Sequence, residues 1–339
     1  MNSYYVCVNK ESCTHVKTAI RMNRSFLQYI PKAIAIFTML SMASCSTYRQ
    51  APTREMIQKA GVITDALDSI CIEGYNLYVA EYVNWVSSDS LLAHYRMDEI
   101  GNIFIWQPTN DTWNVIFMDR EQKKCIFEFR YDISTKEQTI SYDSRPISET
   151  ERGLLEKKNL MQKKAIEQYG DSIRYNPDYG RPNFDFVRID TNTTRMYILQ
   201  GVERSGIIPF GNDYSVDFDN DCNITAFRRY HRSFIPIPND GETVYHSHLK
   251  DNPYITPTDI CNFLLYHGNM KETVVLSTAL NGYIIYNVET HTATFITYEM
   301  MDTKNDKKPL KDKIYGALQH LTPFRNNIGN PALSIRYSM

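Results

Sequence analysis

The sequence contains 339 residues, of which 42% are hydrophobic and 22% are charged. This length allows about two domains, and the composition excludes a disordered, collagen-like or coiled-coil chain as the main architecture. Lys and Arg number 37 against 39 Asp and Glu, which gives a formal net charge of −2. Since nucleic-acid binding depends on an excess of positive charge, we expect no nucleic-acid partner.

The amino-terminal region has the features of an export signal. One apolar run covers residues 33–44, Arg24 and Lys32 precede it, and Cys45 follows it directly. The run is shorter than the 18 or more apolar residues that a membrane-spanning helix needs. With its small residues before the cysteine, the pattern resembles a bacterial lipoprotein signal peptide, which implies cleavage before Cys45 and lipidation of its thiol. An uncleaved membrane anchor is the alternative.

We therefore predict a signal region over residues 1–44, followed by a lipidated cysteine and tether over residues 45–54. Met22 is the expected start, because residues 1–21 would make the positive segment of the signal unusually long. The lipid would hold the mature chain at a membrane of the bacterial cell envelope, on the outer membrane or facing the periplasm.

The other cysteines of the mature chain are widely spaced and form no Cys-x-x-Cys pair. They are Cys71, Cys125, Cys222 and Cys261. This spacing excludes a zinc ribbon and a dense disulfide scaffold. An exported chain permits disulfides, but the spacing assigns none, and we expect each cysteine to be a small buried apolar residue.

The mature chain divides into two parts that each mix strands and helices, which predicts an α+β protein. Residues 55–145 should form an antiparallel β-meander with helices. Apolar residues recur at helical spacing over 55–70, and β-favouring runs follow at 78–86, 102–106, 113–118 and 124–131. The segment 146–183 should be a helix and linker, because Ser148-Glu-Thr-Glu151 is a capping-box pattern and Gly170 is a natural helix stop.

Residues 184–300 are expected to form a second, β-rich domain. Its predicted strands cover 184–189, 196–201, 214–218, 223–230, 243–248, 273–278, 282–288 and 292–298, with a helix from Thr256. Residues 301–339 should be a charged linker and tail that includes an amphipathic stretch over 314–321.

One segment of this second domain combines residues that suit metal chemistry. His246 and His248 are two apart on a predicted strand, so their side chains share one face. Asp259 lies in the first turn of the following helix and Thr256 precedes it. Two histidines and a carboxylate form a three-ligand set that leaves a zinc position open for water. The Thr256 hydroxyl would then be available to donate to a developing oxyanion.

This spacing resembles the signature of the JAB/MPN/JAMM metallopeptidases, in which Ser stands where this chain has Thr256. The resemblance implies a JAB/MPN-like α/β domain over about residues 184–300, with His246, His248 and Asp259 as Zn²⁺ ligands and Thr256 as the hydroxyl helper. Leu249 replaces the usual Pro. The position of the family's general-base Glu is occupied by Thr194, and the nearest substitutes are Glu203 and Glu242.

The same residues also have a purely structural explanation. Thr256-Pro-Thr-Asp259 is a good helix start with Thr at the N-cap, and the two histidines would then be half-exposed strand residues. His231, in a basic and aromatic strand end, is expected to be solvated, although it could also bind a carboxylate or peptide terminus. His267 is expected to cap the helix end.

The leading prediction is an exported lipoprotein with a zinc-binding domain of metallopeptidase ancestry, which would hydrolyse a peptide or isopeptide bond if the site is active. Zn²⁺ would lower the pKa of its bound water toward about 7, and a carboxylate would move the proton. The alternatives are a non-catalytic lipoprotein that holds an envelope protein or peptide, and a structural envelope protein without metal. A carboxylate that faces the histidine pair would favour the enzyme.

Overall fold

A computed structural model describes residues 53–109, 111–301 and 308–318. The predicted signal region and the predicted lipidation site at Cys45 lie outside these residues. Helices and antiparallel sheets are both present, so the predicted α+β class is confirmed. Among the described helices, none is both long enough and apolar enough to cross a membrane.

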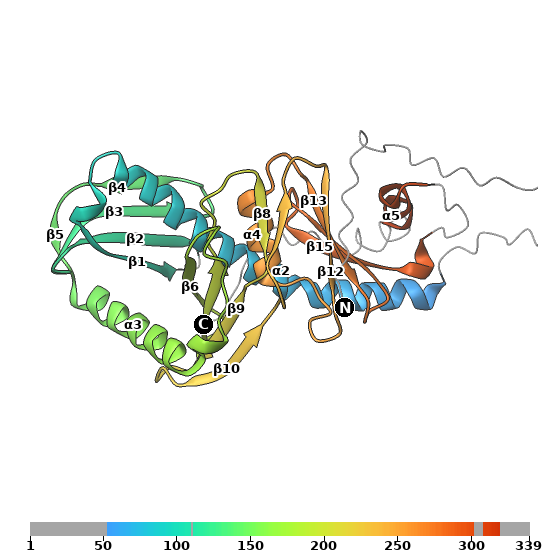
Figure 1. Ribbon diagram of the computed structural model, residues 1–339, viewed down its shortest axis with the longest axis horizontal. Helices are drawn as coiled ribbons and strands as arrows, with labels where there is room; N and C mark the ends of the chain where they lie inside the picture. Colours follow the sequence, from blue (N-terminus) through green and yellow to red (C-terminus); the bar gives the residue numbers. More distant parts are fainter. Residues whose placement is uncertain (1–52, 110, 302–307, 319–339) are drawn as a thin grey trace, which may run out of the picture.

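The helix α2 (Arg54–Leu92) runs along much of the molecule and packs against more than one sheet (Figure 1). Thr53 caps it, since the Thr53 hydroxyl accepts a hydrogen bond from the Met56 amide at 3.2 Å. The strand predicted over 78–86 is wrong, because these residues belong to α2. Val79, Val83 and Val86 recur at helical spacing and pack on the first sheet, so tertiary packing overrides their β propensity.

The first sheet is an antiparallel meander in which β1, β2, β3 and β4 follow one another and β5 also pairs with β3. Its strands are β1 (Ile100–Thr109), β2 (Thr112–Asp119), β3 (Lys124–Asp132), β4 (Gln138–Ser141) and β5 (Arg145–Pro146). The central strand β2 is almost entirely buried, and Trp113, Val115 and Phe117 form a core with α2. The strands predicted from residue 102 onward are therefore present.

The helix α3 (Glu149–Tyr169) begins at the predicted capping box. The Ser148 hydroxyl accepts from the Glu151 amide at 3.2 Å, and the Glu151 carboxylate accepts from the Ser148 amide at 2.9 Å. Met161 and Ala165 on its inner face pack on one face of the second sheet. Glu151 also receives two hydrogen bonds from the Arg145 guanidinium, which ties the helix start to the first sheet.

The second sheet has the strand order β10-β9-β7-β6 and is antiparallel. Its strands are β6 (Pro182–Arg188), β7 (Thr194–Gln200), β9 (Tyr214–Phe218) and β10 (Ile224–Arg229). While α3 covers one face, the other face packs on α2 and α4 through Leu77, Tyr197 and Cys261. A separate two-stranded ribbon pairs β8 (Ile207–Phe210) with β11 (Ile235–Pro238).

The third sheet, in the order β12-β13-β14-β15, carries the predicted histidine strand at one edge. Its strands are β12 (Thr243–His248), β13 (Glu272–Ser277), β14 (Gly282–Asn287) and β15 (Thr292–Thr297). The helix α4 (Pro257–Tyr266) connects β12 to β13, which are parallel, and the other pairs are antiparallel. The first half of α2 shares the core of this sheet.

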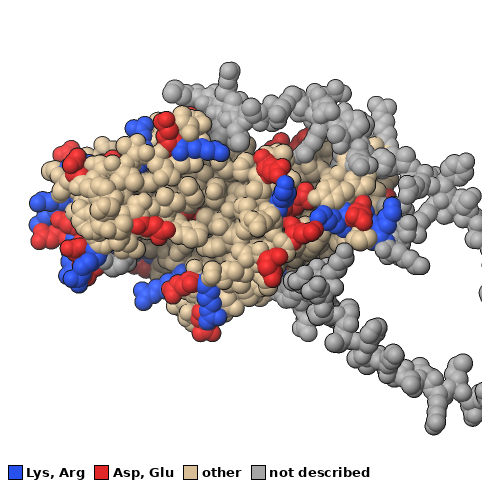
Figure 2. Space-filling view, turned by 90° about the horizontal axis from the view of Figure 1, so that it is seen from above, with Lys and Arg blue, Asp and Glu red and all other residues tan. Residues whose placement is uncertain are grey.

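The remaining described elements are short. They are η2 (Met97–Glu99), η3 (Gly170–Ser172), η4 (Tyr298–Met300) and α5 (Leu310–Leu318). The four described cysteines are buried, as the sequence predicts. On the face seen in Figure 2, acidic and basic side chains lie interspersed, so that face has no extended field of one sign.

Candidate metal centre

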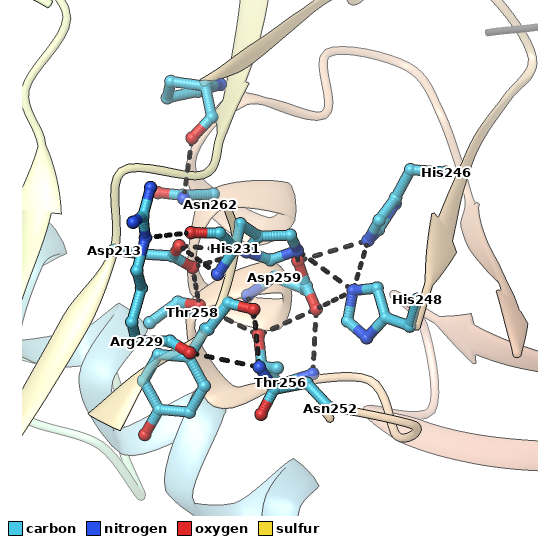
Figure 3. Close-up of polar contacts among 12 residues, drawn as sticks. Asp213, Arg229, His231, His246, His248, Asn252, Thr256, Thr258, Asp259 and Asn262 are labelled. Carbon is cyan, nitrogen blue, oxygen red and sulfur yellow. Dashed lines mark hydrogen bonds and ion pairs between the residues drawn. The ribbon is translucent and has the colours of Figure 1, made fainter. Parts of the chain in front are cut away.

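Three histidines and one aspartate from separate parts of the chain meet in the interior (Figure 3). His246 and His248 point from the same face of β12, as their spacing predicts. Asp259 comes from the first turn of α4, and His231 comes from the segment after β10. All four side chains are buried, and their ligand atoms lie within 4.8 Å of one another. This buried group can hold a metal ion.

The distances from His248 and from Asp259 to the other ligand atoms are close to those around a tetrahedral ion. Bonds of 2.0–2.1 Å in a tetrahedron place neighbouring ligand atoms about 3.3–3.4 Å apart. The Nε2 atom of His248 lies 3.0 Å from that of His231 and 3.1 Å from that of His246. The Asp259 carboxylate lies 3.2–3.3 Å from the Nε2 atoms of the same histidines. The observed distances are slightly shorter than those expected between the ligand atoms of a bound zinc ion.

Outer hydrogen bonds fix how two of the imidazoles present their nitrogens. The Nδ1 atom of His231 lies 2.9 Å from both Asp213 carboxylate oxygens, and that of His248 lies 2.5 Å from the Tyr254 carbonyl oxygen. Both partners are acceptors, so each ring carries its hydrogen on Nδ1. The Nε2 lone pairs of the neutral rings then face each other, and such lone pairs repel unless a proton or a metal ion lies between them.

The charges of the group are strongly coupled in its metal-free form. Burial by itself would lower the pKa of His231, but the Asp213 and Asp259 carboxylates outweigh burial and hold that pKa well above its usual value. The pKa of His248 is lowered to about 4, first by burial and also by the two neighbouring histidines, against the opposite effect of Asp259. Burial would raise the pKa of Asp259, yet the three histidines hold it well below its usual value. Without a metal, the group therefore concentrates its proton on His231.

Asp259 serves two roles with its two carboxylate oxygens. Its Oδ2 atom accepts from the Thr256 amide at 2.8 Å and from the Thr256 hydroxyl at 2.7 Å, which completes a capping box at the start of α4. Its Oδ1 atom is buried and receives no hydrogen bond within the described part of the chain. That oxygen faces His231 and His246 instead. The predicted helix cap is present, and it leaves one oxygen of Asp259 for an ion.

Asp213 supports the group from outside. It lies just before β9, is 1% exposed and, besides the His231 ring, accepts from the His231 amide at 3.2 Å. The Thr258 hydroxyl of α4 also donates to it. Asp213 thus connects the His231 segment to α4 and orients the His231 ring, a role that carboxylates often fill behind histidine ligands of metals.

Three residues were predicted to assist catalysis, and none of them is a member of the buried group. They are Thr256, Glu203 and Glu242. The Thr256 hydroxyl lies 2.9 Å from the Thr258 hydroxyl and is already bonded to Asp259. Glu203 is exposed in the segment between β7 and β8. Glu242 is also exposed, precedes β12, and pairs with Lys311 at 2.8 Å. Neither glutamate belongs to the buried group.

His231 is the member of this buried group that the sequence did not predict. It was expected to be solvated, but it is 6% exposed, so that expectation is wrong. Its neighbours in sequence are basic and aromatic, and its spacing to His246 follows no metal-site pattern. It is brought in by tertiary contacts, among them the hydrogen bonds that the Asn252 side chain donates to the Arg229 and Tyr230 carbonyl oxygens. His267 lies at the C-cap of α4, where its Nδ1 atom lies 2.9 Å from the Met270 carbonyl oxygen.

The buried group offers four protein ligands, which would leave no coordination position for water. A catalytic zinc keeps one coordination position for water or substrate, whereas a structural zinc has four protein ligands. Here four side chains offer ligand atoms, and each of these side chains, counted without its backbone, exposes at most 5% of its surface. Comparison with models of protein families, with curated proteins and with solved structures finds no match for this chain.

Proposed function

We propose that this protein is an exported, lipid-anchored protein of the bacterial envelope whose buried centre binds Zn²⁺ as a structural ion. The observation that carries the proposal is the meeting of four buried side chains, three imidazoles and one carboxylate, whose ligand atoms all lie within 4.8 Å of one another. Three imidazoles and one carboxylate in a tetrahedron suit Zn²⁺ better than Mg²⁺ or Ca²⁺, which prefer oxygen ligands and higher coordination numbers.

A structural role fits this centre better than peptide hydrolysis. The three ligands implied by the JAB/MPN resemblance, His246, His248 and Asp259, would leave the fourth position to water. His231 Nε2 lies 3.3 Å from Asp259 Oδ1 and 3.0 Å from His248 Nε2, which puts it where that water would bind. A hydrolytic centre also needs a base near the water, and Glu203 and Glu242 are exposed and are not members of the buried group. The resemblance then concerns the scaffold of the site rather than its activity.

In this role the metal joins parts of the fold that are distant in sequence. His231 follows the second sheet, His246 and His248 belong to the third, and Asp259 starts the helix between β12 and β13. Metal that binds only the folded state stabilises it, by about 2.7 kcal/mol when free metal is at 100 times its Kd. A domain stiffened in this way on a lipid tether is suited to hold a peptide or protein partner in the envelope.

The test is the metal content and coordination of the purified chain that begins after Cys45. We expect close to one zinc per chain, with four nitrogen or oxygen ligands at about 2.0–2.2 Å in X-ray absorption spectra. His231→Ala should lower zinc affinity strongly. The control is His94→Ala, since His94 is an exposed histidine that contacts Tyr142 rather than the centre.

Two results would argue against the proposal. Unchanged zinc affinity in His231→Ala would mean that this histidine is no ligand, and the centre would then have an open position. Zinc-dependent cleavage of a peptide or isopeptide substrate, abolished by Glu203→Gln or Glu242→Gln, would restore the metallopeptidase interpretation.

A further inference from the structure

A second pair of buried ionisable groups lies between α2 and the second sheet. Glu81 of α2 is 7% exposed and Asp185 of β6 is 4% exposed. The two elements pack on each other, and Asn183, two residues before Asp185 on the same strand, donates from Nδ2 to Glu81 Oε2 at 3.1 Å. Neither carboxyl group belongs to the metal centre.

Each of these carboxyl groups has an oxygen without a donor. Glu81 Oε1 and Asp185 Oδ2 are buried and receive no hydrogen bond from any described residue. Two ionised carboxylates offer only acceptors, so they cannot satisfy one another, and burying both charges side by side is costly. One proton removes both difficulties, because the protonated carboxyl then donates to the ionised one.

We propose that Glu81 and Asp185 share one proton and that this shared proton forms a pH-sensitive contact between α2 and the second sheet. At low pH the proton is in place and the contact is satisfied. As pH rises, the proton leaves, two negative charges remain buried next to each other, and the contact weakens. The proposal is independent of zinc.

The charges around the pair are consistent with one proton. Lys158 of α3 is the cation whose charge acts on Asp185, and its ammonium lies 5.3 Å from the centre of the Phe186 ring. On the α4 side the pair faces the Cys261 thiol and the Tyr266 phenol. Burial raises the pKa of both of these groups, so they are neutral at physiological pH. One lysine balances one carboxylate, and the second carboxylate is neutral only while it holds a proton.

The direction of the pH effect follows from linkage. Burial first, and then the Asp185 carboxylate, hold the pKa of Glu81 well above its usual value; burial likewise raises the pKa of Asp185. The folded chain therefore keeps a proton that the unfolded chain has already lost. Stability from this pair is fully present below the pKa of an unfolded glutamate, about 4.3, and declines as pH rises toward the raised value.

The experiment compares wild type with Glu81→Gln by urea unfolding between pH 5 and pH 8, with the same zinc loading. A glutamine amide donates a hydrogen bond as the protonated acid does, but it does not titrate. We expect the wild-type unfolding constant to rise relative to that of Glu81→Gln, by up to about tenfold per pH unit for one proton. The control is Glu156→Gln, an exposed position on α3, which should follow wild type. Equal pH slopes in wild type and Glu81→Gln would overturn the proposal.

A second measurement applies even where Glu81→Gln does not fold. Infrared spectroscopy of wild type at neutral pH should detect a protonated carboxyl group that resists exchange in D₂O. That signal should be absent from Asp185→Asn as well as from Glu81→Gln, because either change leaves only one carboxyl group, which the new amide satisfies. A wild-type spectrum without a protonated carboxyl group would overturn the proposal.

Discussion

The Nε2 atoms of His231 and His248 lie 3.0 Å apart, although His231 follows the last strand of the second sheet and His248 ends a strand of the third. Both rings are held from behind by acceptors, the Asp213 carboxylate for His231 and the Tyr254 carbonyl for His248. Two lone pairs fixed at this separation require a cation between them. The hydrogen bonds to Asp213 and Tyr254 therefore hold the two rings in a geometry that is favourable only when a proton or a metal ion lies between the nitrogens.

This relationship predicts that Asp213 tunes metal affinity although it is no ligand. Asp213→Asn keeps the size of the side chain but removes the charge that orients His231 and favours its role as ligand. We expect zinc affinity to fall by about 10- to 100-fold. Competition with a chromophoric chelator measures it. The control is Asp251→Asn, because Asp251 pairs with Arg232 close by in sequence yet is exposed. Equal losses in the two variants would contradict a specific role of Asp213.

Metal binding should release a proton. The pKa of metal-free His231 is well above its usual value, because the carboxylates of Asp213 and Asp259 outweigh burial, so this ring is protonated at neutral pH. His248, whose pKa burial lowers to about 4, is already neutral. Zinc must displace the His231 proton, and its affinity should therefore fall by about tenfold for each unit of decreasing pH near neutrality.

Calorimetric titrations with zinc in buffers of different ionisation enthalpy count this proton. In His231→Ala the count should drop toward zero, while in the exposed variant His94→Ala it should stay as in wild type. A wild-type value of zero between pH 7 and pH 8 would contradict the proposed charge state.

Local patterns predicted much of the fold. The capping box at Ser148 marked the start of α3, and the predicted strand over 214–218 has the same bounds as β9. Two errors have physical causes. The run over 78–86 is rich in β-favouring residues, but its packing against the first sheet makes it part of α2. The strands β8 and β11 were missed because they contain proline, which is tolerated there in a two-stranded ribbon.

The sequence predicted only those members of the buried group that lie close together along the chain. His246, His248 and Asp259 lie within one strand-turn-helix segment, so their spacing in sequence is enough to bring them together. Asp213 precedes β9 and His231 follows β10, both strands of the second sheet, and no spacing rule connects either residue to β12. For the predicted general base, closeness in sequence was misleading. Glu242 is near His246 in sequence, but it precedes the strand and pairs with Lys311.

The lipid anchor is a separate prediction that rests on the sequence around Cys45. Cys45→Ala should leave the precursor unprocessed and without incorporated lipid, because the thiol is the group that would carry the lipid. Metabolic labelling with a fatty acid and the mobility of the protein on a gel measure both effects. Cys71→Ala is the control, because Cys71 is a buried core residue of α2. Unchanged labelling and processing of the Cys45 variant would disprove the lipoprotein prediction.

The two roles of Asp259 can be separated by comparing stability with and without metal. Asp259→Asn retains an oxygen that accepts from the Thr256 amide, so the helix cap survives, but a neutral amide is a poor zinc ligand. Thr256→Ala removes the capping hydroxyl, a loss of about 1 kcal/mol that should be present in either condition. Thr256→Ser keeps the hydroxyl and serves as the matched control.

Melting curves of these variants and wild type, each with zinc and with chelator, distinguish the roles. The gap between wild type and Asp259→Asn should widen in zinc by about 2.7 kcal/mol when free metal is 100 times the wild-type Kd, because only a liganded folded state gains this energy. The gap for Thr256→Ala should change far less, since the cap stabilises α4 with or without metal. If the Asp259→Asn gap were the same in both conditions, Asp259 would be a helix cap alone, and the four-ligand centre would lose its carboxylate.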